Sequence, residues 1–495
     1  MQDTAAETSG DRDLGLPKNP WIPYTAIGVL TVAGVASQSM IFVALTQMAA
    51  DFDVTLRAIS WVVIVQGLTI SAVMMPMGRL GDIIGRRKVY LIGVFIFALG
   101  MASTALSPVF GVLIAGRVLA AIGNSMTQAV GTAMGISLFP DSQRGKALGM
   151  QSTLVALGIA LGPVISGVML QFFNWQAIFW LMTVPLIVSF TLAFFLLKEN
   201  VVSNKLPTKR APFDWVGSIV SALVVTIGVL IINNPFAQSI LSPAMLGGAM
   251  SAVLLLGFFI WWELRSDSPM LQLRMFNNRQ FSMAISARYF GFLGQIAMGL
   301  LIPIYLIGLR EFDPAAAGGI LLMTSIGMGT AAQISGRLSG RFGERRFQIF
   351  GFSLLAFVAI IYTTFTLDTP VWLIMLMMGL SGFGLGSWAV SNNSVLMGSV
   401  PRSSIGVVGA LSNLSRNVGS VTGQAIATSV VVGVMASRSF DIPLDDIAGN
   451  DGAISAFMAG WRYAFFAVAV FAVASAVLAT FAGSVAKDEQ VVEAG

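Results

Sequence analysis

Long apolar runs, separated by short polar clusters, follow one another along the chain from about residue 24 to residue 483. A run of roughly 20 apolar residues can cross the hydrocarbon core of a bilayer as a helix. Inside lipid every backbone amide must be bonded within its own segment, which favours helices. The alternating pattern of a membrane β-barrel is not evident. The runs predict fourteen transmembrane helices, at about 24–48, 58–77, 89–107, 109–137, 146–171, 175–197, 214–232, 244–264, 281–307, 315–335, 347–367, 371–397, 405–435 and 461–483.

The composition supports lipid as the solvent and excludes several kinds of chemistry. Of the 495 residues, 56% are hydrophobic and 10% are charged, whereas soluble domains carry about 25% charged residues. The absence of Cys and His excludes disulfides, His metal ligands and Ser-His-Asp triads. All 23 Asp and Glu fall in tails, loops or span ends. We therefore expect an all-α membrane protein that is not an enzyme and holds neither a metal nor a cofactor.

The positive charges favour one orientation in the membrane. With the N-terminus in the cytoplasm, four of the 28 Lys and Arg fall outside and three fall within spans, which leaves 21 on the cytoplasmic side. This excess follows the positive-inside rule and explains the net charge of +5 without a nucleic-acid partner. An even number of spans then predicts that both termini of this multi-pass cell-membrane protein are cytoplasmic.

A sequence repeat relates the two ends of the chain. Residues 78–88, after the second span, read GRLGDIIGRRK, and residues 336–346, after the tenth, read GRLSGRFGERR. Two glycines of span five recur in span thirteen, and Trp175 and Trp461 are predicted to open spans six and fourteen. Internal repeats of this kind are typical of transporters that rock two bundles around a site at the membrane midplane.

The repeat also predicts the domain organisation, in which two six-helix bundles flank an inserted helix pair. The expected parts are an acidic cytoplasmic tail (1–23), an N-terminal bundle (24–197), a linker with inserted spans seven and eight (198–280), a C-terminal bundle (281–483) and a second cytoplasmic tail (484–495).

Several motifs together resemble the major facilitator superfamily. Residues 78–88 resemble its motif A, Arg117 lies where motif B has an arginine, and residues 158–167 (GIALGPVISG) resemble its antiporter motif C. Fourteen spans, with Asp-Trp at 214–215 opening the inserted pair, are similar to the larger drug–proton antiporter family. The resemblance covers residues 24–483. It implies a monomeric transporter of small molecules whose partners are its substrate, the lipid bilayer and, as in that family, protons.

Motif A implies a gate on the cytoplasmic side. The residues that match it are Gly78, Arg79, Asp82, Gly85, Arg86 and Arg87. By the resemblance, Asp82 pairs with basic groups and with the N-terminal end of the family's eleventh span, and so holds the cytoplasmic side shut. A carboxylate at a helix N-terminus is favoured by roughly 0.3–1 kcal/mol. The glycines of the motif allow a tight turn and a close approach of helices.

Motif C is a run of small residues in span five that allows close helix packing, with a proline that removes one backbone hydrogen bond. The residues that match it are Gly158, Gly162, Pro163 and Gly167, while Ser166 stands where the family usually has glycine. A role of this motif in setting the direction of transport is implied by the resemblance alone.

Polar side chains within spans are the candidates for substrate contact. Three arginines lie well inside spans, where an unpaired charge costs several kcal/mol: Arg117, Arg288 and Arg416. Their candidate polar neighbours within spans are Gln38, Asn124, Gln295 and Asn392. For each arginine a structural role between helices and a contact to ligand both remain open, and Arg416, deepest in its span, is the favoured ligand contact.

Span one departs from the resembled family, which usually has an aspartate before a Val-Ala-Leu-Pro segment. This chain has Ser37 at the aspartate position and Thr46 at the proline. Serine does not titrate in a useful range, so we do not expect proton coupling through span one. Ser37 stays a candidate for substrate contact. With buried arginines and no carboxylate, an electropositive cavity favours anionic or neutral amphipathic substrates.

The sequence thus predicts a secondary transporter that exports amphipathic small molecules or drugs by alternating access. The alternative is an exporter or uniporter of an anionic metabolite or lipid without proton coupling in span one. An ion channel would usually show a selectivity loop or a charged ring, and the two-fold repeat favours a carrier. An intramembrane enzyme would need a nucleophile with a base, or paired carboxylates, at membrane depth.

Overall fold

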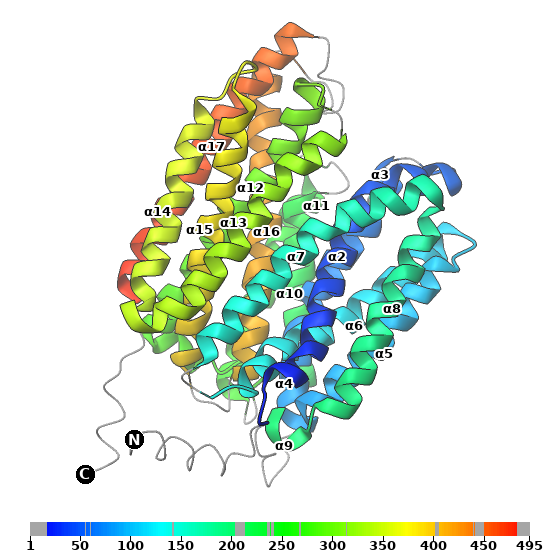
Figure 1. Ribbon diagram of the computed structural model, residues 1–495, viewed down its shortest axis with the longest axis vertical. Helices are drawn as coiled ribbons and strands as arrows, with labels where there is room; N and C mark the ends of the chain where they lie inside the picture. The colour runs from blue at the N-terminus through cyan, green and yellow to red at the C-terminus, as the bar shows by residue number, and fades with distance from the viewer. Residues whose placement is uncertain are drawn as a thin grey trace. The chain divides into compact units, whose positions relative to one another are not determined.

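The predicted helices are present in the protein. The computed structural model describes residues 17–54, 56–59, 61–140, 143–202, 213–234, 238, 242–266, 269–312, 314–400, 405–438, 440 and 450–482. Over these residues all regular elements are helices, and 14 of them are long and apolar enough to cross a membrane (Figure 1). The predicted fold class is confirmed. The C-terminal tail and residues 1–16 of the N-terminal tail lie outside the described residues.

The spanning helices follow the apolar runs closely. They are α2 (Trp21–Asp51), α4 (Trp61–Ile84), α5 (Arg86–Ala105), α6 (Phe110–Ser137), α7 (Arg144–Phe172), α8 (Trp175–Leu196), α10 (Trp215–Asn233), α11 (Pro243–Arg265), α12 (Arg279–Pro303), α13 (Pro314–Phe342), α14 (Glu344–Thr363), α15 (Val371–Gly398), α16 (Ile405–Ser437) and α17 (Asp451–Ala482). Shorter elements are α3 (Leu56–Ile59), α9 (Glu199–Val202), the 3₁₀ helix η2 (Leu273–Asn277) and a π-helical turn η3 (Ile304–Leu309) that follows α12.

Two boundaries differ from the sequence prediction. Helix α17 begins at Asp451, so Trp461 lies inside the helix and does not open it. Motif A is also more regular than a loop, because α4 continues to Ile84 and α5 begins at Arg86. In both cases the helix continues past the apolar run, since only its lipid-crossing part needs to be apolar.

The chain forms two compact units, and two helices contribute residues to both of them. The first unit contains residues 1–147, 154–273 and 402–417, and the second contains residues 148–153, 274–401 and 418–495. These bounds include stretches that lie outside the described residues. Helix α7 therefore supplies a short stretch to the second unit, and α16 supplies its first part to the first unit.

Close glycine contacts hold the helices of the first unit together. Helix α5 meets α6 at Gly100 and Gly123, where an added Cβ would collide with the backbone of the opposite helix. Such small residues let helix backbones approach closely in membranes. On the neighbouring side, the Tyr90 hydroxyl on α5 donates to the carbonyl of Ala26 on α2 at 3.1 Å. The resulting bundle fixes the positions of the polar side chains on α2, α4 and α6.

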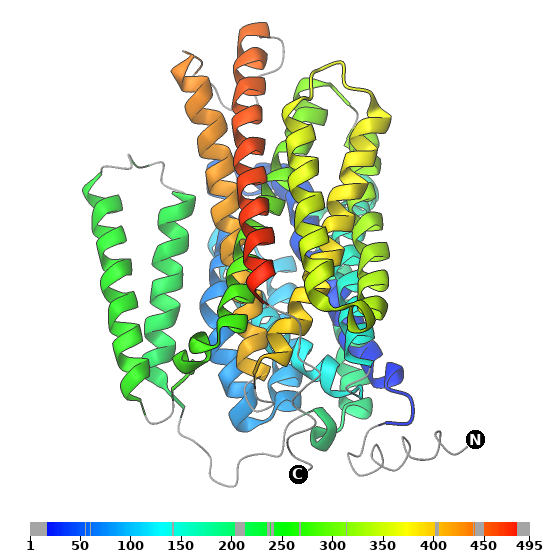
Figure 2. The same cartoon turned by 90° about the vertical axis from the view of Figure 1, so that its left-hand side faces the viewer.

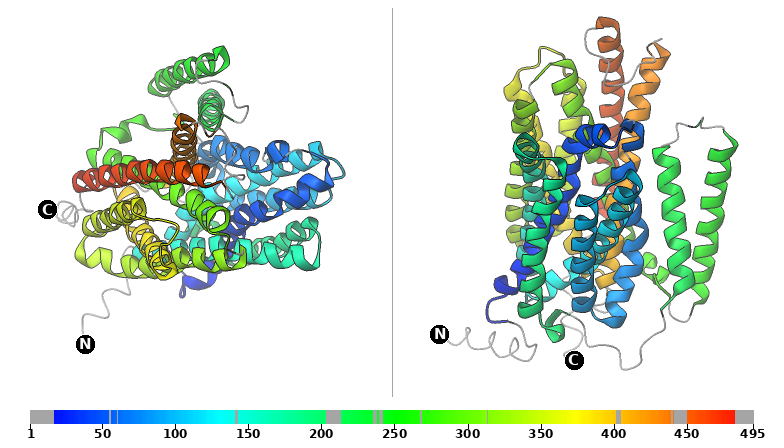
Figure 3. Two further views of the ribbon diagram at one scale, coloured as in Figure 1. Left: turned by 90° about the horizontal axis from the view of Figure 1, so that it is seen from above. Right: turned by 90° about the vertical axis from the view of Figure 1, so that its right-hand side faces the viewer.

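The inserted helices α10 and α11 form an antiparallel hairpin (Figures 2 and 3). Helix α10 packs against α11 on one side and against α4 on the other. Helix α11 exposes large apolar side chains along most of its length, such as Met250 at 61% and Val253 at 66%, which suits contact with lipid. Only a narrow part of the hairpin is therefore buried, and the buried part includes the acidic residues Asp214 and Glu263.

An aromatic cluster forms the centre of the second unit. The Trp461 indole on α17 donates its N–H to the carbonyl of Tyr362 on α14 at 2.7 Å. Its ring lies 5.0 Å from the ring of Tyr305 and 4.5 Å from that of Phe465. All four side chains are fully buried. This cluster joins η3, α14 and α17, and it places Trp461 at a buried contact well inside its helix.

Candidate functional site

The carboxylate of motif A is bound by a neighbouring arginine. Asp82 Oδ1 accepts hydrogen bonds from Arg86 Nε at 3.2 Å and from Arg86 Nη2 at 3.0 Å. The Arg79 guanidinium and the backbone amide of Val407, in the first turn of α16, also act on this carboxylate. Asp82 Oδ2, however, has no hydrogen bond of ordinary geometry within the described residues. Asp82 thus meets basic groups and the start of the thirteenth span, which is the eleventh once the inserted pair is left out.

The remaining residues of motif A shape the turn and anchor it. Gly85 separates α4 from α5 with a φ of 104°, a conformation that side chains rarely adopt. Its counterpart in the repeat, Gly343, has a φ of 91°. Gly78 is buried within α4. Arg87 donates to the carbonyl of Phe194 at the end of α8, so this arginine anchors α5 and does not reach Asp82.

Motif C packs α7 tightly against α2. An added Cβ at Gly158 would lie 2.9 Å from the carbonyl oxygen of Val32, and one at Gly162 would lie 3.0 Å from that of Ala36. Ser166, the residue that departs from the family pattern, donates to the carbonyl of Met40 at 2.9 Å.

The last two motif C residues make no such contact with α2. Gly167 has open space where a Cβ would lie, with nothing within 4 Å. Pro163 lies inside α7, where it does not end the helix. The close contact between the two helices therefore rests on the first part of the motif.

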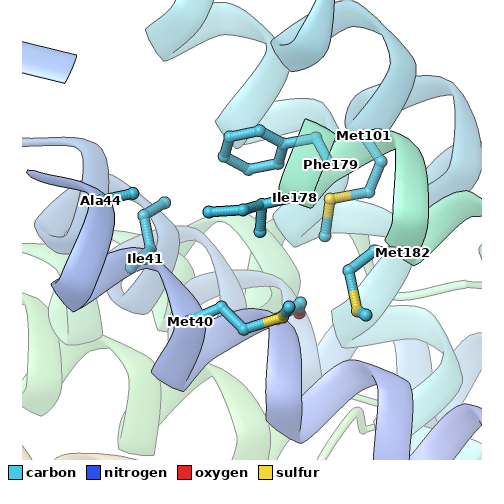
Figure 4. A pocket seen from close by; sticks show the side chains of 8 residues that line it. Met40, Ile41, Ala44, Met101, Ile178, Phe179 and Met182 are labelled. Atoms are coloured by element: carbon cyan, nitrogen blue, oxygen red, sulfur yellow. The ribbon is translucent and has the colours of Figure 1, made fainter. Parts of the chain in front are cut away.

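Span one offers no titratable group at the position where the resembled family has its aspartate. The Ser37 hydroxyl donates to the carbonyl of Gly34 at 2.9 Å, and Gln38 Nε2 donates to the same oxygen at 3.3 Å. Ser37 borders an apolar seam between α2, α5 and α8, with Met101 and Phe179 among its lining residues (Figure 4). The seam has no room for a water molecule, so it is a packed contact and not an open binding cavity.

Arg117 is fully buried and is held by an amide and a ring. Its Nη2 donates to Gln66 Oε1 on α4, and its guanidinium carbon lies 5.6 Å from the ring centre of Phe179 on α8. Its Nε and Nη1 have no hydrogen-bond partner within the described residues. Because no carboxylate forms an ion pair with it in this part of the chain, its positive charge is not neutralised there.

Arg416 belongs to a polar chain that also includes Asn124. Arg416 Nη2 donates to Gln128 Oε1 at 3.0 Å, and Gln128 Nε2 donates to Asn124 Oδ1 at 3.1 Å. Asn413, one turn before Arg416, donates to the carbonyl of Gln128 at 3.3 Å. Asn124 Oδ1 also lies 3.1 Å from the position of a Cβ on Gly34. The first unit therefore gathers Arg416 and Asn124 beside the helix turn that carries the span-one candidates.

The second unit holds the other three candidates. Asn392 Nδ2 donates to the carbonyl of Ala284 at 2.9 Å and to Gln348 Oε1 at 3.3 Å. Arg288, one turn after Ala284 on α12, lies 5.1 Å from the ring centre of Phe292. Gln295, two turns further along, is half-buried, and its Oε1 has no partner within the described residues. Asn392 is thus bonded to α12 one turn from Arg288, and Gln295 Oε1 accepts a hydrogen bond from neither residue.

Three amide side chains that contact the candidates were not predicted from the sequence: Gln66 and Gln348, which are buried, and Gln128, which is half-buried. Each lies on a predicted span or at its edge. A polar side chain within an apolar run was therefore the sequence feature that could have identified them. Glu263, which is 4% exposed near the end of α11, was not predicted either. From the sequence, an acidic residue close to the end of a span is expected to be exposed, because the sequence does not show whether its side chain points toward a neighbouring helix.

A helical protein with fourteen helices able to span a membrane and with the residue patterns of motifs A and C fits the class of secondary transporters. The sequence profile of the Major Facilitator Superfamily matches residues 27–424. The chain is a member of this family of membrane transporters, and it therefore acts on a small-molecule substrate from within the lipid bilayer.

Individual relatives cover most of the chain. The riboflavin transporter RibZ of Clostridioides difficile is 27% identical over 83% of this chain and 88% of its own. The multidrug efflux pump LfrA of Mycolicibacterium smegmatis is 25% identical over 90% of this chain and 87% of its own. The human organic anion transporter MFSD10 matches 94% of this chain and 100% of its own with a TM-score of 0.64 and 15% identity, which shows a shared fold.

Proposed function

We propose that the protein exports amphipathic small molecules, drugs among them, by alternating access between two six-helix bundles at 24–197 and 281–483, and that it acts as a monomer. The observation that carries the proposal is the match to a multidrug efflux pump over 90% of this chain. The tight packing of motif C on α2 supports it, because that motif marks the antiporters of the resembled family.

The buried arginines bear on the charge of the substrate. Amide and ring partners carry no formal charge, so Arg117 and Arg416 keep the interior of the first unit positive. A monovalent cation 4 Å from an arginine costs roughly 4 kcal/mol at an effective dielectric constant of about 20. We therefore propose neutral or anionic amphipathic substrates. The second candidate function is transport of an anionic metabolite or lipid, and the riboflavin transporter among the relatives favours it.

Transport by the purified protein in vesicles tests the proposal. We expect saturable export of neutral and anionic amphipathic compounds and much slower export of a lipophilic monovalent cation. Ser37→Asp, which restores an acid to span one, is expected to raise cation transport and to make its pH dependence steeper, while the neutral Ser37→Asn does neither. Rapid cation efflux by the unmodified protein, driven by a pH gradient, would contradict the electropositive interior.

The charge distribution predicts that both termini are cytoplasmic. Reporter fusions after Lys198 and after Ala486, the latter outside the described residues, are expected to give a cytoplasmic signal in both cases. Alkaline phosphatase and green fluorescent protein serve as opposite reporters at each position. A periplasmic signal at either fusion point would be incompatible with the proposed topology.

We also propose that protons drive export. Since span one has no titratable group at Ser37, the coupling proton must bind elsewhere in the chain. A carboxylate that is buried, incompletely bonded and close to the gate motif is the kind of group required.

A further inference from the structure

A buried pair of carboxylates lies at the base of the inserted hairpin. Asp214, 8% exposed, caps the start of α10 and accepts a hydrogen bond from the amide of Gly217 at 2.8 Å. The Trp262 indole on α11 donates to both of its oxygens, at 3.0 Å to Oδ1 and 3.2 Å to Oδ2. Both carboxylate oxygens of Asp214 are therefore already bonded within the hairpin, Oδ1 twice and Oδ2 once.

Glu263, on the neighbouring α11, lies against the backbone amides of Leu271 and Met270. Its Oε2 accepts a hydrogen bond from the amide of Leu271 at 3.1 Å. Its Oε1 has no hydrogen-bond partner within the described residues, although the side chain is only 4% exposed. A buried polar atom without a partner is destabilising by about 1–3 kcal/mol, so this oxygen is expected to have a ligand.

The two carboxylates meet at Gly217. A Cβ atom added there would lie 2.5 Å from Asp214 Oδ2 and 2.6 Å from Glu263 Oε1. The unbonded oxygen of Glu263 and the less bonded oxygen of Asp214 therefore lie beside the same point, no more than about 5 Å apart. Two adjacent carboxylates in a buried place are not both stable as anions, and a single proton between them removes the repulsion.

We propose that Asp214 and Glu263 form a proton-binding site, in which Glu263 carries the proton on Oε1 and donates it toward Asp214 Oδ2. The proton then satisfies the one unbonded oxygen of the pair, while Asp214 keeps its three hydrogen bonds from Gly217 and Trp262. The site deepens the proposed function, on which its role in energy coupling rests, because it supplies the acid that span one lacks.

The surroundings favour a proton over a metal ion. The charged groups on the elements packed here are Asp214 on α10, Glu263 and Arg265 on α11, and Arg79 and Asp82 on α4. Arg265 is exposed and stacks on Trp261 at 4.6 Å. Arg79 is close enough for its charge to act on Glu263, and a guanidinium beside the site opposes a second cation. No cluster of three or more metal-binding side chains occurs among the described residues.

Arg79 connects the proton site to the gate motif. Its charge acts on Glu263 and on Asp82, and its Nε has no hydrogen-bond partner in the described chain. When Glu263 loses its proton, the anion attracts Arg79 away from Asp82. When Glu263 is protonated, Arg79 is left to Asp82 and strengthens the gate contact. Proton binding at the inserted hairpin thereby changes the stability of the gate.

Infrared difference spectroscopy between acidic and alkaline buffer tests proton binding directly, on the full-length protein in lipid nanodiscs without substrate. We expect a protonated-carboxyl band that is lost at alkaline pH in the unmodified protein, is absent in Glu263→Gln and is shifted in Asp214→Asn. The matched control Asp368→Asn, which alters an exposed acid, keeps the band. Gly217→Ala, whose Cβ collides with both carboxylates, is expected to shift it without changing any charge.

A second measurement follows the gate. The chain has no cysteine, so Ile83→Cys, next to Asp82, provides a single site for alkylation. At one fixed alkaline pH we expect Glu263→Gln to slow alkylation about fivefold, the lower end of typical coupling between sites. Arg79→Gln is expected to abolish that difference.

Each outcome separates this inference from the proposed function. A titrating carboxyl band that persists in Glu263→Gln would overturn the site, as would displacement of the proton by sodium or magnesium ions at constant pH. If Glu263→Gln does not fold, the Asp214→Asn spectrum decides, and an unshifted band there overturns the proposal. If Glu263→Gln leaves proton-driven export unchanged, Asp214 and Glu263 are not the coupling site, and the proposed export function still stands. If the band titrates as expected but the protein exports none of the test compounds, the proton site stands and the proposed function is contradicted.

Discussion

Asp82→Asn is expected to lower export about tenfold, which corresponds to about 1.4 kcal/mol, with no change in the amount of protein in the membrane. The amide has nearly the same shape as the carboxylate but no charge, so the two hydrogen bonds from Arg86 at 3.2 and 3.0 Å lose their ionic character. The attraction to Arg79 and to the first turn of α16 is lost with it. Initial rates of uptake into inverted vesicles, normalised to protein, measure the effect.

Lys88→Gln is the matched control for this prediction. Lys88 belongs to the same basic cluster but is exposed on α5. Lys88→Gln changes the net charge of the motif by one, as Asp82→Asn does with the opposite sign. Because Lys88 is exposed and forms no ion pair with Asp82 within the described residues, near-normal export is expected. If Asp82→Asn transports at the unmodified rate, motif A in this protein serves topology alone and the gate contact has no role in the cycle.

Gly158→Val is expected to reduce export more than tenfold. Its Cβ would lie 2.9 Å from the backbone oxygen of Val32 and 2.9 Å from Val35 Cβ, and the backbone cannot move aside without moving α2. Overpacking of this kind typically costs about 1–3 kcal/mol, and here it would force α7 and α2 apart. Transport rate, together with the thermal unfolding midpoint, separates a lost motion from a misfolded protein.

The same motif contains the control for this substitution. Gly167 has nothing within 4 Å of its Cβ position, so Gly167→Val adds the same side chain without a clash. Export close to the unmodified rate is expected. Equal loss of export in both variants would mean that the whole run is needed for a reason other than the contact between α7 and α2.

The spans could be predicted because lipid imposes a single strong rule on them. A helix must be apolar where it crosses the hydrocarbon core, and all fourteen runs became helices. The residues at which the helices begin and end were predicted less accurately. Helix α17 begins ten residues before Trp461 because polar residues outside the core can stay helical. The turn at Gly85 could be predicted from the repeat, because Gly343 occupies the same position relative to the repeated arginines.

Side-chain partners were harder to predict than helices. The sequence placed Arg117 and Arg416 inside spans, but their partners are Gln66 and Gln128, which had not been singled out. Which residue an arginine meets depends on the rotation of each helix about its axis and on its neighbour, and the apolar pattern of a nearly all-apolar helix does not specify that rotation. Glu263 illustrates the same limit, since its burial depends on how α11 faces α10.

The shared segments of the two units have a consequence for biogenesis. The first unit includes residues 402–417, which the ribosome makes only after most of the second half of the chain. The neighbours of Asp82 and Gln128 on α16 therefore do not exist while the first six helices are being inserted. Until α16 is made, the carboxylate of Asp82 and the half-buried amide of Gln128 lack these partners. A truncated chain that ends before α16 is accordingly expected to be a target of membrane quality-control proteases, even though each of its helices inserts normally.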